Sequence, residues 1–205
     1  MASMASYNTH FYHHNKRHNK AFLKPHITLS QQKQQDEPPN GTTEKKGRSG
    51  TKPNYLGVQK SPPGLALCPA TKNCVSTSEN ISDLTHYAPP WLWNYNPEEG
   101  RGSKKPVAKE QAMEELLQVI KSTKPDNFTP KITEKRDDYV RVEYESPIMG
   151  FVDDVEFWFP PGKKSIVQYR SASRLGNFDF DINRKRIKAL RVALEKKGWA
   201  SENTF

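Results

Sequence analysis

A run of alternating residues between positions 130 and 173 constrains the fold of this chain more than any other feature. The stretches YVRVEYE, VDDVEFWFP and SIVQYRSAS alternate apolar and polar residues, and turn signals separate them at Pro147–Gly150 and Pro160–Lys163. Such alternation places successive side chains on opposite faces of a β-strand. With PKITEKR, which precedes a bend at Arg136–Asp138, the pattern predicts an antiparallel meander packed on one side.

Two segments with helical periodicity flank these strands. The first, 106–122, repeats apolar residues at helical spacing, with Lys and Glu on the opposite side. The second begins near Asp181 and ends at Gly198, and Asn183 and Arg186 project into its apolar arc. The predicted fold class is therefore α+β, an antiparallel three- to four-stranded meander packed against an N-terminal and a C-terminal helix.

The first 60 residues differ in composition from the rest of the chain. They hold ten Lys and Arg against three acidic residues, so they contribute +7 to the formal net charge of +9. No acidic residue precedes Asp36, five of the six histidines lie before it, and the apolar centre of a secretory signal is missing. This composition predicts a transit peptide and disordered leader over 1–60. An ordinary disordered basic tail is the alternative interpretation.

The composition of the leader also predicts where the protein is located in the cell. Because arginine is scarce in it, a chloroplast is favoured, with the mitochondrion as the second choice. No apolar thylakoid-transfer signal follows, so the stroma is favoured over the thylakoid lumen. The rest of the chain carries only +2, which argues against nucleic acid as a partner. No apolar run reaches the ~18 residues of a membrane span, so at most peripheral association with a membrane is expected.

The two cysteines, Cys68 and Cys74, are six positions apart in a stretch with turn-forming residues. A disulfide between them is one interpretation, because the chain can turn back within this distance. A pair of free thiols is the other, favoured in a reducing compartment. A zinc site would need two more ligands, and His86 is the one histidine outside the leader. We therefore predict no metal.

The stretch YAPPWLWNY, Tyr87–Tyr95, combines four aromatic residues with two prolines. Proline excludes a helix here and is tolerated in a sheet only at edges and bulges. We expect an extended strap whose rings lie across the domain and are buried. The alternative is an exposed strip that docks a protein partner.

Two motifs resemble one known family. The first is L-x-x-C-P-x-x-x-N-C-V-S, at residues 65–76. The second is V-x-F-x-F followed by R-S-x-S-R-x-G-x-x-D-x-x-x-N-R-x-R-I, at residues 155–187. Together they resemble the family called domain of unknown function 1499. The resemblance implies a single α+β domain over 62–199 with a short tail, 200–205. The family has bacterial and plant members, and its plant members look like plastid proteins. It implies no reaction, cofactor or catalytic residue.

The segment SRLGNFDFDINRKRI, 173–187, joins the last predicted strand to the last helix. Its polar residues and a neighbour on the strand form the candidate site, either a ligand-binding site or a structural polar network: Arg170, Ser173, Arg174, Asp179, Asn183, Arg184 and Arg186.

As a ligand site, this segment would hold an anionic head group. The planar fork of Arg174 suits a carboxylate or phosphate, and the start of the helix offers free N–H groups. Arg184 and Arg186 would add positive charge.

As a structural network, the same segment would be satisfied internally. Asp179 would cap the helix, and Asn183 would bond to an adjacent backbone group. Arg186 would pair with Asp153 or Asp154, because a buried arginine needs a partner. Adjacent residues of a strand point to opposite faces, so those two carboxylates cannot form a catalytic pair by themselves.

Two functions remain open after these observations. No nucleotide-binding loop, dinucleotide fingerprint, zinc spacing or nucleophile elbow occurs, which predicts no cofactor and argues against an enzyme. The favoured function is a non-catalytic binding or assembly module that holds a protein partner or a small ligand on the open sheet face or the aromatic strap. The alternative is a small enzyme or carrier that binds an anionic or amphipathic ligand between the sheet and the last helix.

Overall fold

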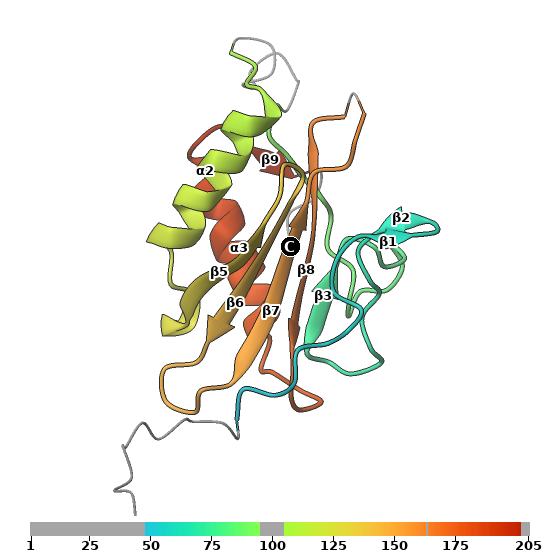
Figure 1. Cartoon of the computed structure of the whole chain (residues 1–205), viewed down its shortest axis with the longest axis vertical. Coiled ribbons are helices and arrows are strands. Elements are labelled where there is room, and N and C mark those ends of the chain that lie inside the picture. Colours follow the sequence, from blue (N-terminus) through green and yellow to red (C-terminus); the bar gives the residue numbers. More distant parts are fainter. Residues whose placement is uncertain (1–47, 95–104, 163, 202–205) are drawn as a thin grey trace, which may run out of the picture. The chain divides into compact units, whose positions relative to one another are not determined.

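The computed structural model describes residues 48–94, 105–162 and 164–201 (Figure 1). These residues belong to one compact unit, Thr43–Phe205. Most of the predicted leader, 1–47, lies outside the described residues, and so does Tyr95 of the aromatic strap.

Four consecutive strands form the antiparallel meander. They are β5 (Thr129–Lys135), β6 (Tyr139–Glu145), β7 (Val152–Trp158) and β8 (Ile166–Ser173), and each pairs with the next. The cross-strand register places Val142, Val155 and Ser171 on one face and Glu156 and its neighbours on the other. The predicted α+β class with a mostly antiparallel sheet is confirmed.

Short strands extend the sheet beyond β8. The opposite edge of β8 pairs with β3 (Cys74–Ser76) near one end and with β4 (Trp91–Leu92) near the other. β4 also pairs with β9 (Ala200–Ser201), which falls in the segment predicted as a tail. A separate two-stranded sheet joins β1 (Gln59–Lys60) to β2 (Pro63–Gly64).

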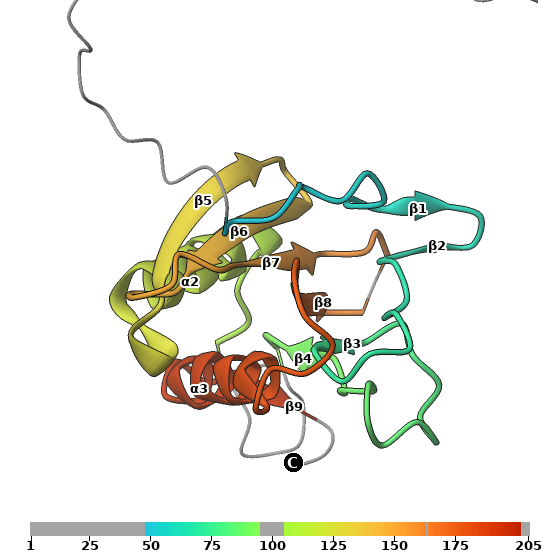
Figure 2. The same cartoon turned by 90° about the horizontal axis from the view of Figure 1, so that it is seen from below.

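Both described α-helices cover the same face of the sheet (Figure 2). They are α2 (Lys109–Ser122) and α3 (Ile182–Glu195), and a 3-10 turn, η1 (Pro125–Asn127), follows α2. The apolar sides of the helices meet the inner face of the meander in one core. Its fully buried members include Leu116, Ile120, Val142, Val155, Phe157, Tyr169, Ile187 and Leu190.

The outer face of the sheet is also covered. The segment 48–66 runs across the side opposite the helices, in blue and cyan in Figure 2. The backbone N–H of Gly57 donates to Glu156 Oε1 at 2.7 Å, and Leu65 packs with the buried Tyr139 and Trp158. The sequence places 48–61 in a flexible leader, whereas here the segment lies against the sheet. The prediction of an open sheet face is therefore wrong, because this segment lies against the outer face.

The aromatic strap is buried, as one of its two interpretations predicted. The Trp91 ring centroid lies 4.5 Å from that of Tyr169 and 5.9 Å from that of Phe157. Trp93 packs against Phe159 in the same core. The alternative interpretation, an exposed docking strip, is thus wrong for these two tryptophans. Within the described residues, none of the helices is long and apolar enough to cross a membrane.

Candidate functional site

The centre of the site is an ion pair between α3 and β7. Arg186 Nη2 lies 2.6 Å from Asp153 Oδ2, and both side chains are buried. The guanidinium also stands over two rings, 4.9 Å from the centroid of Phe128 and 4.7 Å from that of Tyr144. Its other terminal nitrogen, Nη1, donates to Asn183 Oδ1 at 2.9 Å. Arg186 intrudes on the apolar side of α3 because β7 supplies the carboxylate that it needs.

Asn183, one turn earlier on α3, ties the helix to β8 and to the residue before β3. Its Nδ2 lies within hydrogen-bond distance of the carbonyl oxygen of Asn73 at 3.0 Å and of Ser173 Oγ at 2.9 Å. Its Oδ1 accepts from Ser171 Oγ at 2.6 Å. Each of its polar atoms is therefore used inside the protein.

Asp179 accepts hydrogen bonds from backbone N–H groups at the start of α3. It lies two residues before the N-cap residue, Asp181. Its Oδ1 accepts from the N–H of Asp181 at 3.0 Å, and its Oδ2 accepts from the N–H of Asn183 at 2.9 Å. Asp181 holds the cap position itself in a left-handed conformation (φ 62°) and makes no side-chain cap bond. The structure thus brings Ser173, Asp179, Asn183 and Arg186 together in one network.

Arg174 belongs to a different cluster, on the outer face. Its Nε and Nη2 donate to the two carboxylate oxygens of Asp154 at 2.7 and 2.8 Å, and Nη2 also donates to Glu143 at 2.6 Å. Arg141 shares both carboxylates. The hydrogen bonds that Arg174 donates to Asp154, followed by the one to Glu143, raise the pKa of Arg174 despite its burial. The guanidinium fork that suits a bound anion is thus filled by side chains of the protein.

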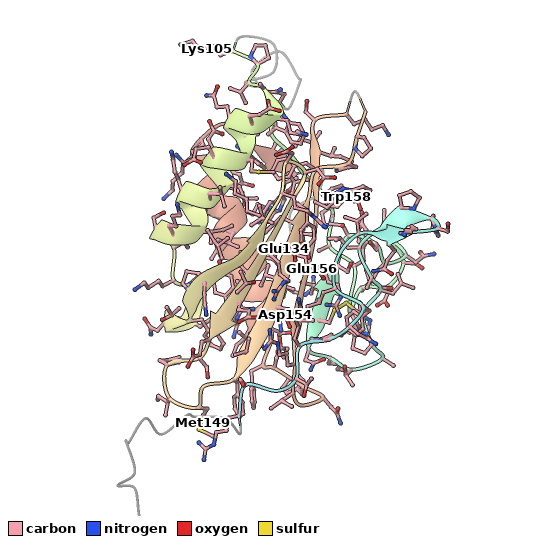
Figure 3. All side chains as sticks on the ribbon, in the orientation of Figure 1. Lys105, Glu134, Met149, Asp154, Glu156 and Trp158 are labelled. Atoms are coloured by element: carbon pink, nitrogen blue, oxygen red, sulfur yellow. A yellow bond between two sulfur atoms is a disulfide. The ribbon has the colours of Figure 1, made fainter. Side chains whose placement is uncertain are left out.

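Arg170 lies on the same outer face, under the covering segment. Its Nη1 is 3.8 Å from Glu156 Oε2, and its Nη2 donates to the hydroxyl of Tyr55 at 3.3 Å. Glu156 Oε1 accepts from the hydroxyl of Tyr139 at 2.8 Å. Burial raises the pKa of Glu156, and the hydrogen bonds from Gly57 and Tyr139 offset part of that rise. Figure 3 shows Glu156 and Asp154 on the same strand.

Arg184 contacts backbone carbonyl groups of a loop, at Leu84 and Thr85. Its Nη2 donates to the carbonyl oxygens of Thr85 at 2.7 Å and Leu84 at 3.3 Å. The predicted anion site required Arg174, Arg184 and Arg186 to act together. The structure instead gives each of them its own partners on different elements.

Cys68 and Cys74 form a disulfide with a Cα–Cα distance of 5.7 Å. The loop that it closes is bonded to the segment after β8. The N–H of Lys72 donates to the carbonyl oxygen of Asn177 at 2.9 Å, and Asn73 Nδ2 donates to that of Gly176 at 2.7 Å. The disulfide loop therefore supports 175–178 from one side.

His86 is held between two acceptors. Its Nδ1 lies 2.9 Å from Asp83 Oδ2, and its Nε2 lies 3.1 Å from the carbonyl oxygen of Thr71. Among the described residues, no group of three or more His, Cys, Asp or Glu side chains is arranged to hold a metal ion.

An apolar cleft of about 600 Å³ opens beside the Asp153–Arg186 pair. Two loops form its walls, 146–151 between β6 and β7 and 175–181 between β8 and α3, and η1 closes one side. Figure 3 labels Met149 at this end of the sheet. Six of the exposed large hydrophobic side chains gather around the cleft: Ile148, Met149, Phe151, Leu175, Phe178 and Phe180.

These six residues are not part of the site predicted from the sequence. A signal for them exists, because two loops rich in Ile, Met, Leu and Phe are unusual where polar turn residues are expected. The polar network and the cleft share Asp153, Ser173 and Asp179, which lie at the boundary between them. A smaller cleft of about 210 Å³ lies on the other side of 175–181 and includes Lys72 and Arg184.

The fold and the site define a class of protein: a small α+β domain whose last helix is tied to its sheet by buried arginine–carboxylate and asparagine contacts. The chain belongs to the family described as a protein of unknown function, DUF1499, which matches residues 64–194. Searches of curated proteins and of solved structures found no match.

Proposed function

We propose that this protein is a non-catalytic binding module whose ligand site is the apolar cleft between the loops 146–151 and 175–181. The observation that carries the proposal is the gathering of six exposed hydrophobic side chains around one hollow. Exposed apolar patches of this kind mark interaction sites and ligand-binding grooves. The bound molecule would be small and amphipathic.

The size and chemistry of the cleft support a small ligand. A volume of about 600 Å³ falls in the range of roughly 300–1,000 Å³ that is typical of small-molecule sites. Such sites combine an apolar lining with a few polar groups, and the lining here includes Ser146, Ser173 and Asp126. The cleft lies between the end of the sheet and the start of the last helix, and Arg174, Asn183 and Arg186 are not part of its lining.

A binding role is favoured over a catalytic one by the state of the polar residues. Arg186, Asn183 and Asp179 direct their polar atoms toward one another and toward the strands. A catalytic acid or base needs a position within hydrogen-bond reach of the substrate. These side chains hold the wall of the cleft in place instead.

The chloroplast stroma is the location that we propose for this activity, with the mitochondrion as the second choice. Its support is the acid-free, basic and hydroxyl-rich composition before Asp36. Import of the labelled full chain into isolated chloroplasts, with removal of the leader, tests the proposal. Uptake by mitochondria alone would contradict it.

The ligand site is tested with a neutral apolar dye, Nile red, added to the full chain. We expect dye fluorescence to rise on binding, and Phe180→Ala to weaken that binding several-fold, because the ring lines the cleft. Ile81→Ala is the matched control, since its side chain is similarly exposed (67% against 72% for Phe180) and lies outside the cleft. Equal loss in both variants, or no saturable dye binding, would overturn the proposal.

A further inference from the structure

We propose that the apolar cleft selects an organic cation, an alkylated ammonium group attached to an apolar body. This inference rests on the proposed binding function and names the chemistry of the ligand. It follows from the charges that line the cleft, from its aromatic rings and from the positions of the nearest basic residues.

Among the described residues, the ionisable side chains that line the cleft are all acidic. They are Asp126, Asp153 and Asp179, and no described Lys, Arg or His belongs to the lining. The charge of Asp153 is balanced by Arg186, at 2.6 Å. Asp179 accepts hydrogen bonds from the N–H groups of Asp181 and Asn183 and from Asn183 Nδ2, all of which are neutral donors. The exposed carboxylate of Asp126 has no ion-pair or hydrogen-bond partner among the described residues.

Four phenylalanine rings share this lining. Phe128 forms part of the inner wall, and Phe151, Phe178 and Phe180 stand on the two loops. The rings of Phe178 and Phe180 meet edge to face with centroids 4.9 Å apart. Aromatic faces attract cations, and clusters of them bind quaternary ammonium groups. Phe128 already receives a cation within the protein, because the Arg186 guanidinium stands 4.9 Å from its centroid.

Arg186 is already paired with Asp153, and two exposed basic side chains contact residues of the walls. Arg48 Nη1 donates to the sulfur of Met149 at 3.6 Å, and Lys185 Nζ donates to the carbonyl oxygen of Phe180 at 3.0 Å. Neither residue lines the cleft. An anionic head group inside it would face the carboxylates of Asp126 and Asp179, whereas an ammonium group would be attracted by both.

A small molecule fits these features better than a membrane surface does. The hollow has the volume of a small-ligand site. Peripheral proteins bind anionic bilayers through clusters of Lys and Arg at the contact surface. A cleft whose charged lining is acidic would be repelled by such a bilayer.

The test compares three probes of equal chain length with the full chain, below their micelle concentrations. The probes are octyltrimethylammonium, octanol and octanoate, and binding is measured by displacement of Nile red and by calorimetry. We expect octyltrimethylammonium to bind at least about tenfold more tightly than octanoate, with octanol between them. A tenfold ratio corresponds to about 1.4 kcal/mol.

Two variants locate the charge effect. Asp126→Asn removes one carboxylate charge at a left-handed position (φ 52°) that asparagine tolerates well. It should weaken octyltrimethylammonium binding several-fold and leave octanol binding unchanged. Asp137→Asn is the matched control, because Asp137 is also exposed and lies outside the cleft. It should change neither.

Each contrary outcome has a distinct meaning. If octanol binds and octanoate binds as tightly as the ammonium probe, the inference of cation selection is overturned and the binding function stands. If no probe displaces the dye and no heat is measured, the binding function fails, and the inference fails with it. If Phe180→Ala weakens binding of the chain to anionic phosphatidylserine vesicles and the ammonium probe does not displace Nile red, the cleft is a membrane contact and the inference is overturned.

Discussion

Arg186 Nη2 on α3 lies 2.6 Å from Asp153 Oδ2 on β7, and the two side chains are 0% and 4% exposed. The pair fixes the start of the last helix against the sheet at the wall of the apolar cleft. Because both charges are removed from water, each side chain needs the other to compensate its buried charge. The pair therefore makes the position of the helix specific.

Loss of the arginine should destabilise the fold strongly. Arg186→Met leaves Asp153 buried without its cation, which typically costs about 3–5 kcal/mol of unfolding free energy. Urea denaturation of the full chain measures the change. The control is Lys188→Met, an exposed position on the same helix, where we expect a change within about 0.5 kcal/mol. Adding Asp153→Asn to Arg186→Met should restore part of the loss, and a purely additive double variant would contradict the pairing.

The start of α3 depends on Asp179 more than on Asp181. Asp179→Ala removes the acceptor of two backbone N–H groups and should cost about 1–2 kcal/mol. Asp181→Asn keeps the left-handed conformation and loses no cap bond, so its thermal midpoint should match that of the wild type. A larger loss in Asp181→Asn than in Asp179→Ala would show that the cap assignment is wrong.

Stability should fall in acid partly through Glu143. Burial raises the pKa of its carboxyl, but hydrogen bonds from Arg174 and Arg141 outweigh this effect and lower it below the ordinary value of 4.5. A lowered native pKa means that the stabilisation is present above about pH 4.5 and is lost as pH falls through the native pKa. Because the group is partly exposed, we expect less than about 1 kcal/mol.

Glu143→Gln isolates this contribution. Its unfolding free energy, measured from pH 6 to pH 3, should be lower than that of the wild type at the upper end of the range. The two curves should converge as pH falls, because the wild-type carboxylate becomes neutral. A constant difference between the curves would contradict the assigned pKa shift.

Reduction of the Cys68–Cys74 disulfide should loosen one wall of the cleft. The closed loop holds 175–178 through Lys72 and Asn73, and closing a loop of this size stabilises the fold by about 2 kcal/mol. We expect dithiothreitol to lower both the thermal midpoint and the affinity for Nile red. A Cys68→Ser/Cys74→Ser variant should bind dye weakly with or without dithiothreitol. Two free thiols found by mass spectrometry after mild oxidation would contradict the pairing.

Much of the fold follows from local pattern. The alternation over 139–145 and 152–159 places Val142 and Val155 inward and Glu156 outward, as observed. The helical spacing in α2 and α3 predicts which of their sides are buried. The intrusion of Arg186 into the apolar side of α3 also points to a buried partner, because an unpaired internal charge is too costly.

The partners of the outer-face residues do not follow from the same pattern. Arg174 is 20 residues from Asp154 and 31 from Glu143 in sequence, and no local period links them. The hydrogen bond from the N–H of Gly57 to Glu156 links residues that are 99 positions apart in the sequence. Sequence reasoning left the outer face open because the segment 48–61 has the composition of a flexible linker and is ordered by contacts with the sheet.

The sequence by itself determined the α+β class, the faces of the meander and the need of Arg186 for a carboxylate, since each depends on periodicity or on the cost of burying a charge. Tertiary structure alone decided that Asp153 is that carboxylate, that Arg174 and Arg184 have separate partners, and that 146–151 and 175–181 enclose a cleft. The physical reason is that loops have no repeating pattern. Their hydrophobic side chains form a site only where the ends of distant strands and a helix bring them together.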